Sequence, residues 1–301
     1  MFGQRSFLIF RKARERLGIN LGVLLNVFFL VLVMSLTSFL QQRDVRAKFK
    51  QEFPKPRLVP SQELLAPLLS TTPGLIGTAF DYLMRFHAKY INPQAIEQKW
   101  IAEDSLRLLR QPKFKHLYEQ GYFIIIQAKE QYLDFLKTGQ ATEALIQSAL
   151  GLAKLDVVYR SRKNPENLQQ VDETDVEDLK NLVAIIERKK FQTDGVVVLN
   201  PTFGKASKLV GAADGDLILD DLLIDIKTFS RFKWERDDFN QLIGYYTLAR
   251  IGSIDGAPPQ HEIKRLGIYF ARHAYLHVIP VEEVIDEAKF PHFIEWFQNR
   301  A

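Results

Sequence analysis

The chain has 301 residues, of which 47% are apolar and 25% are charged, and its formal net charge is +4. This is a globular composition with room for one large domain or two small ones. No cysteine is present, which excludes disulfides and cysteine-ligated zinc or iron–sulfur centres. Residues 1–60 hold eleven Lys or Arg against three Asp or Glu, so the remainder carries a net charge of −4. Contact with a polyanion must therefore come from a local basic patch.

The N-terminal segment is strongly apolar. Residues 21–40 have the length and composition of a membrane span, with basic residues on both sides that give no clear orientation. No small-residue cleavage site follows, which disfavours a signal peptide. Three interpretations stay open: an over-extended start with Met34 as the true first residue, a membrane anchor at residues 19–40, or an apolar helix of a soluble protein.

The rest of the chain divides by its periodicity. Prolines at 54, 56 and 60 mark an irregular link, and helical spacing follows from Ser61 and over 81–90, 94–110, 113–137, 140–159 and 172–190. After Gly195 the pattern predicts strands at 196–199, 216–219, 222–227, 265–272 and 275–279, with helices at 237–250 and 290–299. We predict an α/β (α+β) fold: a hydrophobic segment at 1–40, a helical region at 41–190, and a core at 191–301 with a mixed central sheet flanked by helices.

Two charges interrupt the apolar strand 222–227. Asp225 and Lys227 are two residues apart, so their side chains point to the same face. Charges on a core-facing strand are costly unless they are paired or bind a cation. Asp214 and Asp216 lie just upstream, and this gathering of acids favours a metal-dependent hydrolytic site.

A hairpin turning at residues 220–221 brings these acids together. It pairs Leu219 with Leu222, Asp216 with Asp225, and Asp214 with Lys227. Cross-strand Cβ atoms lie roughly 4.5–5.5 Å apart, so a divalent cation would relieve the repulsion between the two paired carboxylates. Asp-Asp is not a favoured pair for a tight turn, and a one-residue slip would turn Asp216 to the wrong face. The plainer interpretation is a surface hairpin with an Asp214–Lys227 salt bridge.

Three stretches resemble the PD-(D/E)XK nuclease superfamily, and most closely its RecB-like exonuclease branch. They are Gly-Ala-Ala-Asp-Gly-Asp at 211–216, Asp-Ile-Lys at 225–227 and Gln-Leu-Ile-Gly-Tyr at 241–245. The resemblance covers roughly residues 195–250. It implies a restriction-endonuclease-like fold and a Mg²⁺-dependent (or Mn²⁺-dependent) nuclease, a hydrolase of DNA phosphodiester bonds.

The resemblance also implies roles for individual residues. Asp225 would hold the metal together with Asp214, which the Gly-x-x-Asp spacing favours, or with Asp216, which the hairpin register favours. Lys227 would position or activate the attacking water, and Gln241 and Tyr245 would flank the site. The implied catalytic set is Asp216, Asp225, Lys227, Gln241 and Tyr245. No proline precedes either upstream Asp, a departure that this superfamily often shows.

The helices contribute two further expectations. Gln241 and Tyr245 are four residues apart, on a different face of helix 237–250 from its apolar residues. The superfamily often adds a carboxylate from a helix before the sheet, and the candidates are Asp156, Glu177 and Glu187. For Asp156 we favour the simpler interpretation, an ion pair with Arg160 one helical turn on.

A basic and aromatic stretch leaves the strand 222–227. Its cations are Arg231, Lys233 and Arg236, interleaved with Phe229, Phe232 and Trp234. Cations suit phosphates and aromatic faces stack on unpaired bases, so the stretch is a candidate DNA contact. An ordinary connecting loop with a tryptophan anchored in the core is the other interpretation.

The sequence therefore predicts a metal-dependent nuclease that acts on DNA. No Gly-rich phosphate loop followed by Lys-Ser or Lys-Thr is present, so no nucleotide cofactor is expected. A nuclease acting on cellular DNA is expected in the cytoplasm, anchored to a membrane if residues 1–33 are genuine. The alternative is a non-catalytic module of the same fold that binds nucleic acid or serves in assembly.

Overall fold

The computed structural model describes residues 35–58, 61–161 and 167–301 of the chain. The described helices are α3 (Leu36–Leu40), α4 (Arg43–Glu52), α5 (Pro73–Ile91), α6 (Ile101–Leu109), α7 (Lys115–Thr138), α8 (Glu143–Ser161), α9 (Glu173–Ala184), α10 (Arg236–Ile251) and α11 (Phe290–Arg300). The strands are β1 (Ile96–Glu97), β2 (Val197–Leu199), β3 (Leu217–Leu219), β4 (Leu222–Lys227), β5 (Arg265–Phe270) and β6 (Tyr275–Pro280).

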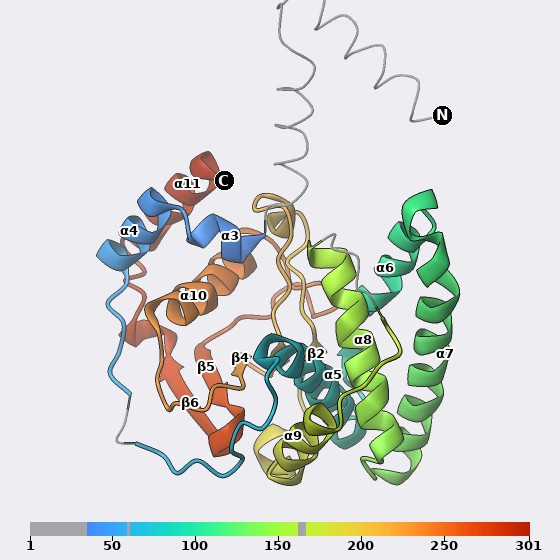
Figure 1. Ribbon diagram of the computed structural model, residues 1–301. Coiled ribbons are helices and arrows are strands. Elements are labelled where there is room, and N and C mark those ends of the chain that lie inside the picture. The colour runs from blue at the N-terminus through green and yellow to red at the C-terminus, as the bar shows by residue number, and fades with distance from the viewer. Residues whose placement is uncertain (1–34, 59–60, 162–166) are drawn as a thin grey trace, which may run out of the picture.

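One six-stranded mixed sheet organises the fold, in the order β1-β2-β3-β4-β5-β6. The pairs β1–β2 and β4–β5 are parallel, and the other three neighbouring pairs are antiparallel. Helices lie on both sides of the sheet, with α5 to α9 on one side and α3, α4, α10 and α11 on the other (Figure 1). The predicted mixed α/β architecture is confirmed at this level.

Alternation along the strands separates two hydrophobic cores. In β4, Leu222 and Ile224 pack into the core shared with α5 to α9, whereas Leu223 packs into the core shared with α10 and α11. Because side chains alternate with a period of two, Asp225 continues the series of Leu223 toward α10. The face of β4 that carries the predicted site is therefore the face that α10 covers.

Helices α3 and α4 pack on the α10 side of the sheet. The ring of Phe39 lies 5.1 Å from that of Phe297, and Phe49 lies 5.1 Å from Phe293, between ring centroids. Among the described helices none is long and apolar enough to cross a membrane. Most of the predicted apolar span, residues 19–34, lies outside the described residues, and Leu36–Leu40 forms the five-residue helix α3.

Three local predictions were wrong. Residues 61–72 are irregular and not helical, because Pro67 interrupts the leucine-rich stretch and the carbonyls of Ala66 and Pro67 accept hydrogen bonds from Arg272. Residues 96–97, predicted as helix, form β1 beside β2. The helix predicted over 172–190 ends at Ala184, and a separate 3₁₀ turn covers Arg188–Phe191.

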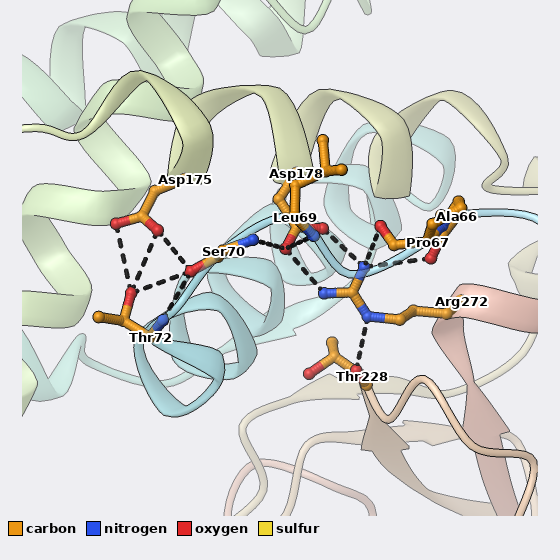
Figure 2. A network of polar contacts seen from close by, with 9 residues as sticks. All are labelled: Ala66, Pro67, Leu69, Ser70, Thr72, Asp175, Asp178, Thr228 and Arg272. Carbon is orange, nitrogen blue, oxygen red and sulfur yellow. Dashed lines mark hydrogen bonds and ion pairs between the residues drawn. The ribbon is translucent and has the colours of Figure 1, made fainter.

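A buried ion pair fastens the irregular segment to the sheet (Figure 2). Arg272 and Asp178 both have fully buried side chains and meet at 2.6 Å between Nη1 and Oδ1. The guanidinium also donates to the carbonyl of Thr228 at 2.8 Å, directly after β4. Asp178 in turn accepts from the backbone amides of Leu69 and Ser70. One pair thus ties α9, the end of β4, the 3₁₀ turn after β5 and residues 66–70 together.

Candidate active site

The predicted hairpin register is confirmed. Strands β3 and β4 pair Leu219 with Leu222, Ile218 with Leu223 and Leu217 with Ile224. Asp220 adopts a φ of 51°, which an aspartate tolerates, and its carboxylate accepts from Thr193 Oγ1 at 2.6 Å. This support for the turn replaces the Gly that a two-residue hairpin usually carries.

Asp216 lies beside Asp225, as the register requires. The last paired residue of β3 is Leu217, and Asp216 Oδ2 accepts the backbone amide of Ile226 across the hairpin at 2.6 Å. The predicted pairing of Asp214 with Lys227 is wrong. Asp214 forms an isolated bridge with Thr202, and its carboxylate pairs with Arg160 at 2.8 Å. The structure therefore places Asp216, and not Asp214, next to Asp225.

A polar chain joins β4 to α10. Lys227 Nζ lies 2.9 Å from Asp225 Oδ2 and donates to Gln241 Oε1 at 2.9 Å. Gln241 Nε2 then donates to the hydroxyl of Tyr245 at 2.8 Å, and Asp238 lies 3.8 Å from the lysine. Four of the five predicted catalytic residues, Asp225, Lys227, Gln241 and Tyr245, are thus joined by direct polar contacts. The fifth, Asp216, contacts the same strand through its hydrogen bond from the Ile226 amide.

Burial and mutual repulsion dominate the electrostatics. Burial raises the pKa of Asp225, partly offset by Lys227. Burial, followed by the charges of Asp81 and Asp225, raises the pKa of Asp216 well above its ordinary value. For Lys227, burial alone would lower the pKa, but the carboxylates of Asp225, Asp216 and Asp238 together raise it. The group is therefore an excess of buried acid around one ammonium.

A cavity of about 280 Å³ opens beside this group. Its polar lining comes from the start of α3, from α5, α8 and α10, and from the stretch before β3. It comprises Ser35, Thr37, Thr78, Asp81, Asp156, Arg160, Asp214, Asp216, Gln241 and Tyr245. Burial raises the pKa of Asp81, and the charge of Asp214 raises it further while Arg85 opposes the rise. Sequence reasoning missed Asp81, because an Asp four residues before Arg85 is typical of an ordinary helix ion pair.

The candidates for an extra helical carboxylate fare differently. Asp156 does line the cavity, but its predicted ion pair with Arg160 is wrong. Asp156 Oδ1 instead accepts from the Tyr82 hydroxyl at 2.8 Å. Glu177 lies 3.9 Å from Lys180 and Glu187 lies 2.5 Å from Lys190, and neither lines the cavity.

The buried Asp156 should make stability depend on pH. Burial raises its pKa to about 7, opposed by Arg85 and Arg160 and aided by Asp81. The folded carboxyl therefore keeps its proton between about pH 4 and pH 7 while the unfolded one loses it, so stability falls as pH rises through that window. In metal-free buffer, the free energy of unfolding of Asp156→Asn should fall less over this pH window than that of wild type. The difference should be on the order of a few kcal/mol.

Urea unfolding of wild type and Asp156→Asn at a series of pH values measures this difference. The control is Asp134→Asn, because the Asp134 side chain is 66% exposed. Its curve should parallel that of wild type. If the Asp156→Asn curve also ran parallel, Asp156 would ionise normally in the folded protein.

The predicted DNA-contact cations are mostly engaged elsewhere. Arg236 Nη2 donates to the carbonyls of Phe49 and Phe53 at 2.6 and 2.8 Å, where it closes the end of α4. Lys233 pairs with Glu235 at 2.5 Å. Arg231 is exposed and, with Lys233, lines a separate surface hollow of about 510 Å³. The prediction that these three residues bind DNA stays a prediction.

The donor set suits a hard cation, with one restriction. Carboxylate oxygens are the ligands that Mg²⁺ prefers. Asp81 Oδ1 is buried without a hydrogen-bond partner, and Asp225 Oδ2 is buried with the Lys227 ammonium 2.9 Å away. Within the described residues, no three His, Asp or Glu side chains converge into a ready metal site. Mg²⁺ commonly takes one or two protein carboxylates and completes its shell with water and substrate phosphate. In that mode Asp216 and Asp225 are the candidate ligands.

Comparison of the chain with protein-family models, with curated proteins and with solved structures found no match. The functional argument therefore depends on the residues and their geometry.

Proposed function

We propose that this chain is a metal-dependent nuclease that hydrolyses DNA phosphodiester bonds, with a PD-(D/E)XK-type site and a restriction-endonuclease-like core of the RecB-like branch. The observation that carries the proposal is the face of β4 that α10 covers. Asp216 and Asp225 adjoin across the hairpin there, and Lys227, Gln241 and Tyr245 form one polar chain. The resemblance assigns these same five residues to one site.

Asp216 and Asp225 would hold the cation, and Asp81, whose charge acts on Asp216, is a further carboxylate on the helical side. When bound, Mg²⁺ or Mn²⁺ would neutralise charge on the phosphate and acidify the attacking water. Each chain residue then has a defined task. Lys227 presents a fixed ammonium, because Asp225 and Gln241 both hold its Nζ. Such a pre-oriented charge stabilises the negative charge that develops on the phosphate oxygens.

Gln241 and Tyr245 hold the Lys227 ammonium in place. Gln241 accepts from the lysine and donates to the tyrosine, so both ends of its amide are used. Tyr245 is buried and stacks on Phe203, with ring centroids 5.9 Å apart. The tyrosine thereby anchors the amide, and the amide anchors the ammonium against rotation.

The full-length protein should cleave DNA only when Mg²⁺ or Mn²⁺ is present, because the acid pair needs a cation before a phosphate can approach. Linear, circular and single-stranded substrates measure the activity and its preference. Isothermal titration with Mn²⁺ measures binding, which Asp225→Asn should abolish and Asp134→Asn should leave intact. Mn²⁺ binding at Asp225 without cleavage of any substrate would favour the non-catalytic module. Failure to bind Mn²⁺ would exclude the proposed site.

A further inference from the structure

The cavity beside the acid group has an unusual charge balance. Four carboxylates face it, and among the described residues that line it Arg160 is the only cation. Those carboxylates that are ionised repel an entering phosphate, and of the described lining residues only Arg160 attracts it. A nuclease that uses this cavity needs a positively charged side chain at the cavity wall in addition to the metal ion.

Arg160 has the position and freedom to fill this role. It lies near the end of α8, and its Nη2 donates to Asp214 Oδ2 at 2.8 Å across the cavity wall. Its side chain is 51% exposed, so the guanidinium can exchange partners without unpacking a core. Arg85 lacks this freedom, because its side chain is 7% exposed and pairs with Asp81.

We propose that Arg160 binds a phosphate of the substrate, and that Asp214 holds the guanidinium at the cavity wall while the site is free of substrate. This inference rests on the proposed function and adds a phosphate contact to it. The planar guanidinium matches a phosphate through two parallel hydrogen bonds, and a phosphate oxygen replaces Asp214 as acceptor. Contact with the polyanion thus comes from α8, on the helical side of the sheet.

Asp214 then has a different role from the one its sequence spacing implied. It is a positioning residue for Arg160, and it competes with the substrate for the guanidinium. The two residues should therefore respond to substitution in opposite directions. Loss of the arginine weakens substrate binding, and loss of the aspartate charge strengthens it.

Fluorescence anisotropy with a labelled single-stranded oligonucleotide, with Ca²⁺ in place of Mg²⁺, measures binding by the full-length protein. Arg160→Gln should raise the dissociation constant about tenfold and reduce the slope of log affinity against log salt by about one. Arg160→Lys should restore part of the affinity, since it keeps the charge but not the two-pronged geometry. Asp214→Asn should bind more tightly than wild type.

The matched control is Arg107→Gln, since Arg107 is 77% exposed and only weakly paired, 3.6 Å from Asp104. Its affinity and salt slope should equal those of wild type. Equal weakening by Arg160→Gln and Asp214→Asn would overturn the inference and make the pair structural, as would an unchanged salt slope in Arg160→Gln. Cleavage by wild type in Mg²⁺ is scored separately. Arg160-dependent binding without cleavage would sink the nuclease proposal and leave the phosphate site standing.

Discussion

Lys227→Met is expected to lower the single-turnover rate of DNA cleavage by about 10²–10³-fold, the usual cost of removing one pre-oriented electrostatic group from an active site. Asp225→Asn should lower it at least as much, because it removes both a ligand candidate and the partner of the lysine. The two side chains contact each other at 2.9 Å. The double variant should therefore lose far less than the product of the two single losses.

Folding must be separated from chemistry in this test. Lys227→Met leaves the carboxylate of Asp225 buried beside Asp216 without its cation, and some stability will be lost. Circular dichroism and urea unfolding identify a temperature at which wild type and every variant are folded. Cleavage rates are then compared at that temperature. Lys137→Met and Asp134→Asn alter one exposed pair on α7 and should cleave at the wild-type rate. A wild-type rate in Lys227→Met or Asp225→Asn would falsify the site assignment.

The hairpin shows what sequence reasoning can predict. Its strands alternate cleanly between two cores, and a two-residue turn fixes the register, so the placement of Asp216 beside Asp225 followed from counting. The contact between Gln241 and Tyr245 was predictable for the same reason, because residues four apart share a face of one regular helix. Local periodicity is sufficient where each residue's direction is set by its own element.

Local sequence patterns could not predict the contacts between elements that are distant in the chain. Asp81 is far from Asp216 in the chain and forms an ordinary helix pair with Arg85, so nothing near it indicates the cavity. Arg160 similarly had a plausible partner one turn back, Asp156, and the fold gave it Asp214 instead. Arg236 was a candidate DNA contact, but its guanidinium donates to backbone carbonyls at the end of α4. In each case the charge of the side chain is evident from the sequence, and only the packing of distant elements selects its partner.

Stability should depend most on the buried pair of Arg272 and Asp178. Arg272→Met is expected to lower the free energy of unfolding by about 3–5 kcal/mol, since it strands a fully buried carboxylate. It also leaves the carbonyls of Thr228, Ala66 and Pro67 without their donor. Because Thr228 directly follows Lys227, the variant should also loosen the end of β4. Activity should then fall even at temperatures where the protein remains folded.

Urea unfolding of Arg272→Met, Asp178→Asn and Arg272→Met/Asp178→Leu measures the effect. The double variant replaces both charges with apolar groups and should recover part of the loss, since a buried pair costs much of its attraction in desolvation. The control is Lys289→Met, which breaks a surface pair whose lysine is 75% exposed, and it should change stability by less than about 1 kcal/mol. If Arg272→Met matched this control, the segment 66–70 would be held by its apolar contacts and the buried pair would contribute little to holding β4 against α9.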